Sequence, residues 1–337
     1  MPGGDREAYA RLKPILDAVA ARDFDGGGCV TYVGAGASGH FVKMVHNGIE
    51  YAVMQIMAEA YDVLRKAYGK SASEIADIFE RYAAGDLGSY LFDISVAVLR
   101  TKDDLGTGAN LVDNVLDRAG QKGTGKWTVV DALERGVAVP SIAEAVFARN
   151  VSSQRSLRLA LSEASANSTS TKVSTEPKAN ASDFEKMLEK ALKASILSAY
   201  AQGYDLIATA SAEENWGVDL AEVSRIWQGG CIIRAKVLSA LRSAYTAGRN
   251  EKIPHLFEIP NMRETLETSG EDWKNVTRTA IAAGVPVPAI SAGLAYYESL
   301  TDVSLPANFL QGLRDHFGAH TYERTDREGV FHSKWGA

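Results

Sequence analysis

Most of the chain carries the hydrophobic periodicity of α-helices. The longest uninterrupted stretch spans residues 41–68, contains no proline and has Gly48 as its single internal glycine. At about 1.5 Å per residue, a helix of this length spans roughly 40 Å and can cross a whole domain. A second long helix is predicted over residues 183–212, because Ser182 and Glu185 have the spacing of a capping box. These two helices are expected to form the core.

Shorter helices with polar turns between them fill the remaining sequence. They are predicted at residues 6–22, 75–84, 90–99, 111–119, 273–283 and 288–300. The segment ILSAYAQGYDLIATA in the second long helix loosely echoes the first, which suggests an internal duplication. Residues 161–182 are low in complexity and poor in apolar side chains, which is typical of a mobile surface loop. The pattern predicts an all-α domain over residues 1–312 and an extended C-terminal tail over 313–337.

A glycine-rich segment, CVTYVGAGASGHF, precedes the first long helix. Gly34, Gly36 and Gly39 match the GxGxxG pattern of dinucleotide-binding folds. Such a fold needs a second strand after the helix, with an acidic residue at its end. Here the helical pattern continues, and Ser71 and Glu74 form a capping box that starts another helix. The glycines are therefore predicted to let the chain pack closely as it turns into the long helix.

Polar side chains interrupt the apolar pattern of the first long helix at regular intervals. Counted from Lys43, they lie 3, 4, 7 and 8 residues further on, at His46, Asn47, Glu50 and Tyr51. This spacing places all five on one face of a helix. Ionisable groups are costly to bury unless they bind something, so the stripe is a candidate site. The spacing alone equally fits a solvent-exposed helix face.

A second candidate site is the segment QKGTGKWT, residues 121–128. Backbone amides of a glycine-rich turn, together with lysines, suit an anion. It is not a phosphate-binding P-loop, because GTGK is the whole match and no strand precedes it. A basic surface turn is the alternative interpretation of these residues.

Three motifs in the same order resemble the 6-phosphogluconate dehydrogenase family: VKMVHNGIEY, KGTGKWT and EAVFAR. The resemblance extends along nearly the whole chain. It implies that Lys43 is the general base and Glu50 the general acid. It also implies that His46, Asn47 and Tyr51 bind the substrate. Lys122, Thr124 and Arg149 would bind it too, mainly at its phosphate. Arginine suits a phosphate because its planar guanidinium binds two oxygens at once.

The C-terminal segment is rich in aromatic residues for a free chain end, including Phe331 and Trp335. Exposed aromatic residues at a terminus are typical of a segment that docks elsewhere. The family resemblance implies a homodimer in which each tail enters the other subunit. There Arg314 and His320 would complete the partner's substrate site.

The resemblance further implies the reaction, NADP-dependent oxidative decarboxylation of 6-phosphogluconate to ribulose 5-phosphate, without a metal ion. Family members carry an N-terminal nucleotide-binding domain, which we expect to be absent from this chain. We therefore expect NADP to bind outside it and the chain alone to be inactive. Two alternatives remain: a related β-hydroxyacid dehydrogenase, which would keep Lys43 and Asn47, and a non-catalytic helical module that dimerises or binds a phosphorylated ligand.

Composition narrows the partners and the compartment. The 337 residues are 46% hydrophobic, with a net charge of -6 and a pI near 5.6, which argues against binding nucleic acid or an anionic membrane. No apolar run approaches the roughly 18 residues of a membrane span, and no signal peptide is recognisable. Cys29 and Cys231 lack metal-ligand spacing, so a reduced, cytoplasmic protein is expected.

Overall fold

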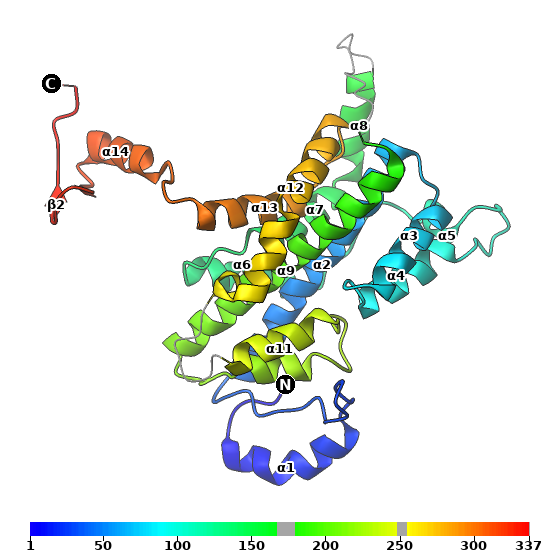
Figure 1. Ribbon diagram of the computed structural model, residues 1–337, viewed down its shortest axis with the longest axis horizontal. Helices are drawn as coiled ribbons and strands as arrows, with labels where there is room; N and C mark the ends of the chain where they lie inside the picture. Colours follow the sequence, from blue (N-terminus) through cyan, green and yellow to red (C-terminus); the bar gives the residue numbers. More distant parts are fainter. Residues whose placement is uncertain (167–178, 248–254, 337) are drawn as a thin grey trace. The chain divides into compact units, whose positions relative to one another are not determined.

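The computed structural model describes residues 1–166, 179–247 and 255–336, which are mostly α-helical (Figure 1). The prediction of an all-α fold is confirmed. The helices of the described residues are α1 (Arg6–Val19), α2 (Ser38–Tyr68), α3 (Ala72–Ala84), α4 (Tyr90–Arg100), α5 (Leu111–Asn114), α6 (Thr124–Glu134), α7 (Pro140–Ser153), α8 (Arg155–Ala166), α9 (Ala181–Glu213), α10 (Leu220–Ile226), α11 (Val237–Ala247), the 3₁₀ turn η1 (Leu256–Glu258), α12 (Pro260–Ala282), α13 (Pro288–Thr301) and α14 (Ala307–Gly318). A short hairpin joins β1 (Tyr322–Glu323) to β2 (Val330–Phe331) in antiparallel register.

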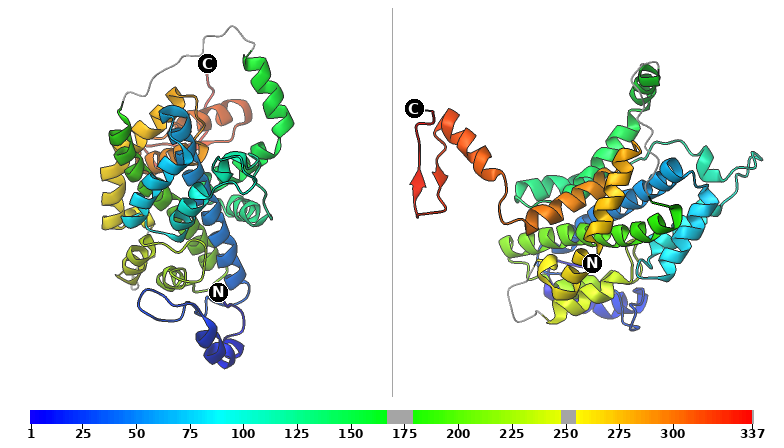
Figure 2. Two further views of the ribbon diagram at one scale, coloured as in Figure 1. Left: turned by 90° about the vertical axis from the view of Figure 1, so that its right-hand side faces the viewer. Right: turned by 45° about the horizontal axis from the view of Figure 1, so that its top comes forward.

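The long helices α2 and α9 pack against each other at the centre of the main helical unit (Figures 1 and 2). Their contact is close because Gly203 of α9 has no side chain. A Cβ atom there would lie 2.6 Å from Cδ1 of Ile49 and 3.2 Å from Cγ1 of Val45, both on α2. Ile49 and Val45 are completely buried. The predicted two-helix core is therefore present, and it depends on this backbone approach.

The packing partners of the two long helices follow a repeated order. After α2, helices α3 and α4 pack on each other, and α6 and α7 return to α2. After α9, helices α10 and α11 pack on each other, and α12 returns to α9. An internal duplication would produce such an order, and the duplication stays a prediction.

Helix α13 is attached to the core by a buried carboxylate. Glu59 of α2 accepts hydrogen bonds from the backbone N–H groups of Ala289 and Ile290, each at 2.9 Å. These donors lie in the first turn of α13, where helical N–H groups otherwise lack partners. Burial raises the pKa of Glu59 to about 7, against the opposing effect of these two hydrogen bonds. A side chain of the first long helix thereby caps a helix more than 200 residues later in the chain.

The N-terminal segment confirms the role predicted for the glycine-rich motif. A Cβ on Gly39 would lie 2.2 Å from the carbonyl oxygen of Met1, and one on Gly34 would lie 2.6 Å from that of Trp216. The chain therefore passes too close for any side chain at these positions. Residues 29–33, a segment with high strand propensity, form no strand.

Several predicted boundaries are wrong. Helix α9 is capped by Asn180, whose side chain accepts from the N–H of Asp183, and not by the predicted box of Ser182 and Glu185. Residues 161–166 of the predicted mobile loop belong to α8, and 167–178 lie outside the described residues. Helix α5 ends at Asn114, before the predicted end at residue 119, and α12 starts well before residue 273. The capping box of Ser71 and Glu74 is confirmed.

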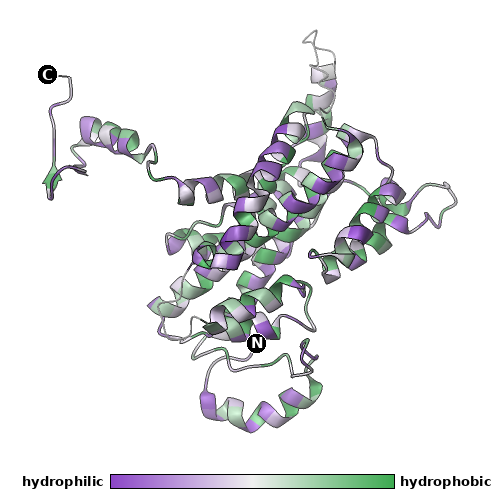
Figure 3. Ribbon diagram, viewed as in Figure 1, coloured by the Kyte–Doolittle hydropathy of each residue, from purple (hydrophilic) through white to green (hydrophobic). Residues whose placement is uncertain are grey.

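The chain divides into two compact units, Met1–Leu294 and Ala295–Ala337. The second unit contains the end of α13, the helix α14 and the β1–β2 hairpin. In α14, hydrophobic and hydrophilic residues both occur (Figure 3), and its apolar residues Phe309, Leu313 and Phe317 are exposed within the chain. Among the described residues, no helix combines the length and hydrophobicity that crossing a bilayer would require.

We predict that Gly203→Ala destabilises the protein by about 1–3 kcal/mol, because the new methyl group overpacks the α2–α9 contact. Gly270→Ala in α12 is the matched control, since no described atom lies within 4 Å of the position that a Cβ would take there. That control should instead stabilise the helix by up to about 1 kcal/mol. Urea unfolding of both variants measures the difference, and equal midpoints would contradict a tight helix contact.

Candidate active site

The polar stripe of α2 forms a connected set of side chains. The Lys43 amine donates to Oδ1 of Asn47 at 2.7 Å and lies 3.2 Å from Nδ1 of His46. His46 and Tyr51 are buried, Asn47 and Glu50 are half-buried, and Lys43 is exposed. The predicted grouping on one helix face is therefore present, with Lys43 as its exposed member.

His46 is a neutral member of this set. Burial, followed by the neighbouring charge of Lys43, lowers the pKa of His46 to about 3. Its Nδ1 lies 4.0 Å from a carboxylate oxygen of Glu50, but a neutral ring cannot form an ion pair with it. The other ring nitrogen, Nε2, has no hydrogen-bond partner among the described residues, and the ring meets that of Trp227 at 80°. Trp227 thus closes the buried side of the stripe.

Glu50 lies where a carboxyl group tends to keep its proton. Burial raises the pKa of Glu50 above its usual value, while the positive charges of Lys43 and Arg149 act in the opposite direction. A carboxyl group with a raised pKa can donate a proton near neutral pH. The pKa of Glu50 is therefore shifted in the direction that proton donation requires.

Glycines bring α6 onto the same face of α2. A Cβ on Gly48 would lie 2.6 Å from the Thr128 side chain, and one on Gly125 would lie 2.5 Å from the Tyr51 ring. Thr128 also donates from its hydroxyl to the backbone carbonyl of Met44 at 2.9 Å. This packing carries the start of α6, at Thr124, to the polar stripe.

The N-terminus of α6 follows a left-handed residue, Gly123, whose φ is 94°. Unpaired N–H groups at the start of a helix favour an anion. Lys122 precedes this turn and is exposed, and it makes no hydrogen bond or ion pair within the part of the chain that the structure describes. The structure thus places Thr124 beside the stripe but does not fix the amine of Lys122.

Arg149 of α7 is half-buried against the stripe. Its guanidinium lies 3.5 Å from the centroid of the Tyr51 ring, in a cation–π arrangement. It also donates to the carbonyl oxygen of Gly120 at 3.2 Å and contacts the sulfur of Met54 at 4.0 Å. These contacts hold the cation close to Glu50.

An open cleft of about 680 Å³ joins the stripe to α6 and to the turn after α9. Lys43, Asn47 and Thr124 line it. Sequence reasoning missed the aromatic part of its lining, Phe41, Trp127 and Trp216, and the charged residues Arg135 and Glu214. Trp127 belongs to the KGTGKWT motif and could have been noticed, whereas nothing in the local sequence marks Trp216 as a neighbour of Phe41, although their ring centroids lie 5.2 Å apart.

The two tail residues of the predicted site lie in the second unit. Arg314 of α14 donates to the side chain of Gln311 at 3.1 Å. The ring of His320 meets the ring of Phe317 at 78°, with centroids 5.9 Å apart. Both residues therefore have defined surroundings within their own unit.

The comparisons with known proteins agree with one another. The family profile described as "6-phosphogluconate dehydrogenase, C-terminal domain" matches residues 39–335. The chain belongs to the 6-phosphogluconate dehydrogenase family. It is 47% identical over 336 residues to the decarboxylating 6-phosphogluconate dehydrogenase of Synechococcus elongatus, and 44% identical to the NADP(+)-dependent decarboxylating enzyme of Bacillus subtilis. Each alignment covers 99% of this chain and 70% of the relative.

A solved structure shows the same fold. The 6-phosphogluconate dehydrogenase of Plasmodium falciparum, described in its apo form and in complex with NADP+ and with 6-phosphogluconate, has a TM-score of 0.93 and 40% identity. The match covers 99% of this chain and 70% of that one. These relatives favour the 6-phosphogluconate dehydrogenase family over the β-hydroxyacid dehydrogenases and over a non-catalytic module.

The described residues do not fit a dinucleotide, although NADP is the cofactor of the family's enzymes. In the GxGxxG segment, the space beside Gly34 and Gly39 is taken by the protein's own backbone at Trp216 and Met1. A pyrophosphate needs that space for itself. Nor does the described part of the chain gather three histidine, cysteine or carboxylate side chains as a metal ion would require.

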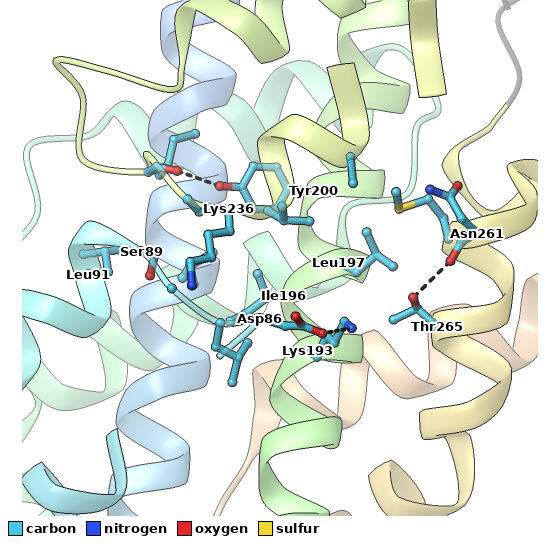
Figure 4. Close-up of a pocket in the computed structure, with 18 of the residues that line it drawn as sticks. Asp86, Ser89, Leu91, Lys193, Ile196, Leu197, Tyr200, Lys236, Asn261 and Thr265 are labelled. Atoms are coloured by element: carbon cyan, nitrogen blue, oxygen red, sulfur yellow. Dashed lines mark hydrogen bonds and ion pairs between the residues drawn. The ribbon is translucent and has the colours of Figure 1, made fainter. Parts of the chain in front are cut away.

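A second pocket, of about 330 Å³, lies elsewhere in the first unit (Figure 4). It is bordered by Asp86, by Lys193 and Tyr200 of α9, and by Lys236. Its polar groups already have partners: Lys193 pairs with Asp86 at 2.5 Å, and the hydroxyl of Tyr200 donates to a backbone carbonyl at 2.9 Å. None of the predicted site residues borders this pocket, so it is not part of the family's candidate active site.

Proposed function

We propose that this chain binds 6-phosphogluconate in the α2–α6 cleft and carries the acid and base of its oxidative decarboxylation to ribulose 5-phosphate. The observation that supports this most directly is the single face of α2. It places an accessible amine, Lys43, in the cleft beside the start of α6, and a half-buried carboxyl, Glu50, about two turns further along the same face. A group that can accept a proton and a group that can donate one suit a substrate that first loses and then gains a proton.

Lys43 is proposed as the general base. In its neutral form it takes the proton of the substrate's 3-hydroxyl group as C3 is oxidised. The resulting ammonium then polarises the 3-keto oxygen while carbon dioxide leaves. Asn47 accepts a hydrogen bond from this amine and holds it toward the cleft, and the neutral His46 beside it adds no competing charge.

Glu50 is proposed as the general acid. It donates its proton to C1 of the enediol that remains after decarboxylation. Burial favours its protonated form before this step, and the neighbouring cations Lys43 and Arg149 stabilise the carboxylate after it. The oxidation itself needs a hydride acceptor, which is NADP in the relatives. Because the described residues do not fit it, we propose that this chain alone has no dehydrogenase activity.

We propose that the substrate phosphate binds between α6 and α7. Thr124 and the N-terminus of α6 offer hydrogen-bond donors, and Arg149 offers a charged fork beside them. Lys122 would close over the anion from the preceding turn. His46, Asn47 and Tyr51 would contact the sugar portion from the α2 face.

The remaining ligands are proposed to come from a second copy of the chain. In a homodimer with exchanged tails, Arg314 and His320 of one subunit would reach the phosphate in the other. The exposed apolar residues of α14 support a docked tail, and so do exposed residues of α6 and α7 such as Trp127, Leu133 and Phe147. We keep residues 1–312 as the substrate domain and 313–337 as the exchanged tail.

We also propose a cytoplasmic location and no nucleic-acid or membrane partner. Cys29 and Cys231 are both free thiols, which fits a reducing compartment. The net charge of -6 disfavours polyanionic partners.

The role of Lys43 is tested by Lys43→Met in the enzyme assembled with the family's nucleotide-binding domain. Loss of a general base should lower kcat by about 10²–10⁴-fold, with a much smaller change in KM. Lys66→Met is the matched control, because Lys66 lies on the same helix but pairs with Asp62 at the surface. NADPH formation measured by absorbance decides the matter: a normal kcat for Lys43→Met would refute the assignment of the base.

The phosphate site is tested by Arg149→Lys in a calorimetric titration of this chain. An ammonium cannot reproduce the two-oxygen fork, so the affinity for 6-phosphogluconate should fall by about 1.5–3 kcal/mol. The much weaker binding of unphosphorylated gluconate should stay unchanged. Arg158→Lys, an arginine that pairs with Asp117 on the surface, is the control. Equal losses for both ligands would show that Arg149 does not serve the phosphate.

Tail exchange is tested with mixed dimers of the assembled enzyme. When one subunit carries Lys43→Met and the other Arg314→Ala, an exchanged tail leaves one site intact, and about half of the activity should remain. When both changes are on the same subunit, neither site is intact under exchange, and activity should vanish. The opposite pattern of activities would show that each tail serves its own subunit.

A further inference from the structure

The C-terminal unit is organised around one buried carboxylate. Asp315 of α14 has no exposed surface, although the apolar residues of the same helix are largely exposed. Its carboxylate accepts four hydrogen bonds, from the N–H of Thr321 at 2.9 Å, Nδ1 of His332 at 2.9 Å, the N–H of Ser333 at 3.1 Å and Nε1 of Trp335 at 2.8 Å. These donors come from the turn after α14 and from the strand end after β2. One side chain therefore ties α14 to both sides of the hairpin, which follows α14 along the chain (Figure 2).

This carboxylate is held in its charged form. Burial opposes ionisation, but the hydrogen bonds from His332, Ser333, Trp335 and Thr321 outweigh it, and they hold the pKa of Asp315 well below its usual range. A buried carboxylate with all its donors in place rigidifies the groups around it. The second unit thus has a polar centre in place of a hydrophobic core.

The turn that contains His320 has an unusual backbone. Of the three non-glycine residues with positive φ in the described ranges, two flank His320: Ala319 with φ of 48° and Thr321 with φ of 62°. A β-branched residue such as threonine rarely adopts this left-handed conformation, because its Cβ substituents crowd the backbone. Such strain persists where the surroundings over-determine it, and it concentrates at functional sites.

Thr321 is held from both sides. Its N–H donates to Asp315, and its carbonyl oxygen accepts from the side chain of Gln311 at 2.5 Å. Gln311 in turn accepts from Arg314 at 3.1 Å. Asp315 and Gln311 therefore fix the turn beside His320, and Gln311 also links that turn to Arg314 on the same helix.

The ring of His320 is confined as well. It covers Gly318, where an added Cβ would lie 2.7 Å from ring atoms, and it meets the ring of Phe317. A side chain at residue 318 would displace the imidazole. Helix end, glycine and strained turn together place the exposed ring of His320 against the end of α14.

We infer that Asp315 is a positioning residue that holds the strained turn at residues 319–321, so that His320 and Arg314 are prearranged for the substrate site of a second copy. The inference rests on the proposed function of Arg314 and His320. It assigns to Asp315 no contact with substrate. Its effect comes from avoiding the cost of ordering two ligands at the moment of binding.

The test is Asp315→Asn in the assembled dimeric enzyme. Thr321 and His332 bond one carboxylate oxygen, and Ser333 and Trp335 bond the other. An amide has a single acceptor oxygen, so in either orientation its NH2 group faces N–H donors and the centre cannot be satisfied. We expect kcat/KM for 6-phosphogluconate to fall roughly 10- to 100-fold, as for other small misplacements of binding groups. Asp326→Asn is the matched control, because that carboxylate of the same tail pairs only with Arg324 and Arg327 among the described residues. It should behave like wild type.

A rescue separates positioning from general tail stability. Glycine adopts positive φ without strain, so Thr321→Gly should restore much of the activity lost in Asp315→Asn. If Asp315 served only to hold the hairpin, this change would restore nothing, since a glycine at residue 321 replaces none of the hydrogen bonds that the amide fails to make to the hairpin. Absence of rescue would therefore overturn the inference. Gln311→Ala, which releases Thr321 without touching the buried centre, should cause a smaller loss with the same rescue.

A double-substitution cycle links the effect to the ligands. In a His320→Ala background, Asp315→Asn should cost much less than in wild type, because the residue it positions is already gone. Equal costs in both backgrounds would overturn the inference. If His320→Ala and Arg314→Ala are fully active, the proposed function of the tail fails and the inference falls with it. If those two variants lose activity while Asp315→Asn keeps it, the inference alone is overturned. Light scattering confirms that the variants compared are dimers.

Discussion

The structure depends on the two opposite faces of α2. One face must be apolar and flat enough to let α9 approach, which Val45 and Ile49 achieve against Gly203. The other must keep Lys43 and Glu50 at the border between core and solvent. Ionisable groups survive there because the helix itself is held rigidly by its buried face. The α2–α9 contact therefore also fixes where the polar stripe faces.

Burial shifts the pKa values of His46 and Glu50 in opposite directions, and both shifts favour the uncharged form. It keeps His46 neutral and favours the protonated form of Glu50, since both charged forms lose hydration. The nearby cations Lys43 and Arg149 limit the second effect, so that Glu50 can still become a carboxylate. A proton donor that must also be regenerated needs such a balance between desolvation and charge.

The C-terminal unit is stabilised by hydrogen bonds more than by a hydrophobic core. A short segment that leaves its apolar residues Phe309, Leu313 and Phe317 exposed cannot use them for its own core. Hydrogen bonds to the buried carboxylate of Asp315 provide the internal order, while the apolar residues of α14 stay exposed. The same arrangement explains how a strained turn at Thr321 can persist in a small unit.

The sequence by itself determined the helical class, the two long helices and the common face of Lys43 and Glu50, because helical periodicity depends only on spacing along the chain. It also determined the local cap at Ser71. The tertiary structure decided which faces are covered: that Trp216, far along the chain, lines the cleft, and that Glu59 is buried beneath α13. Periodicity shows where a face points but not what lies on it, since that depends on contacts between residues hundreds of positions apart.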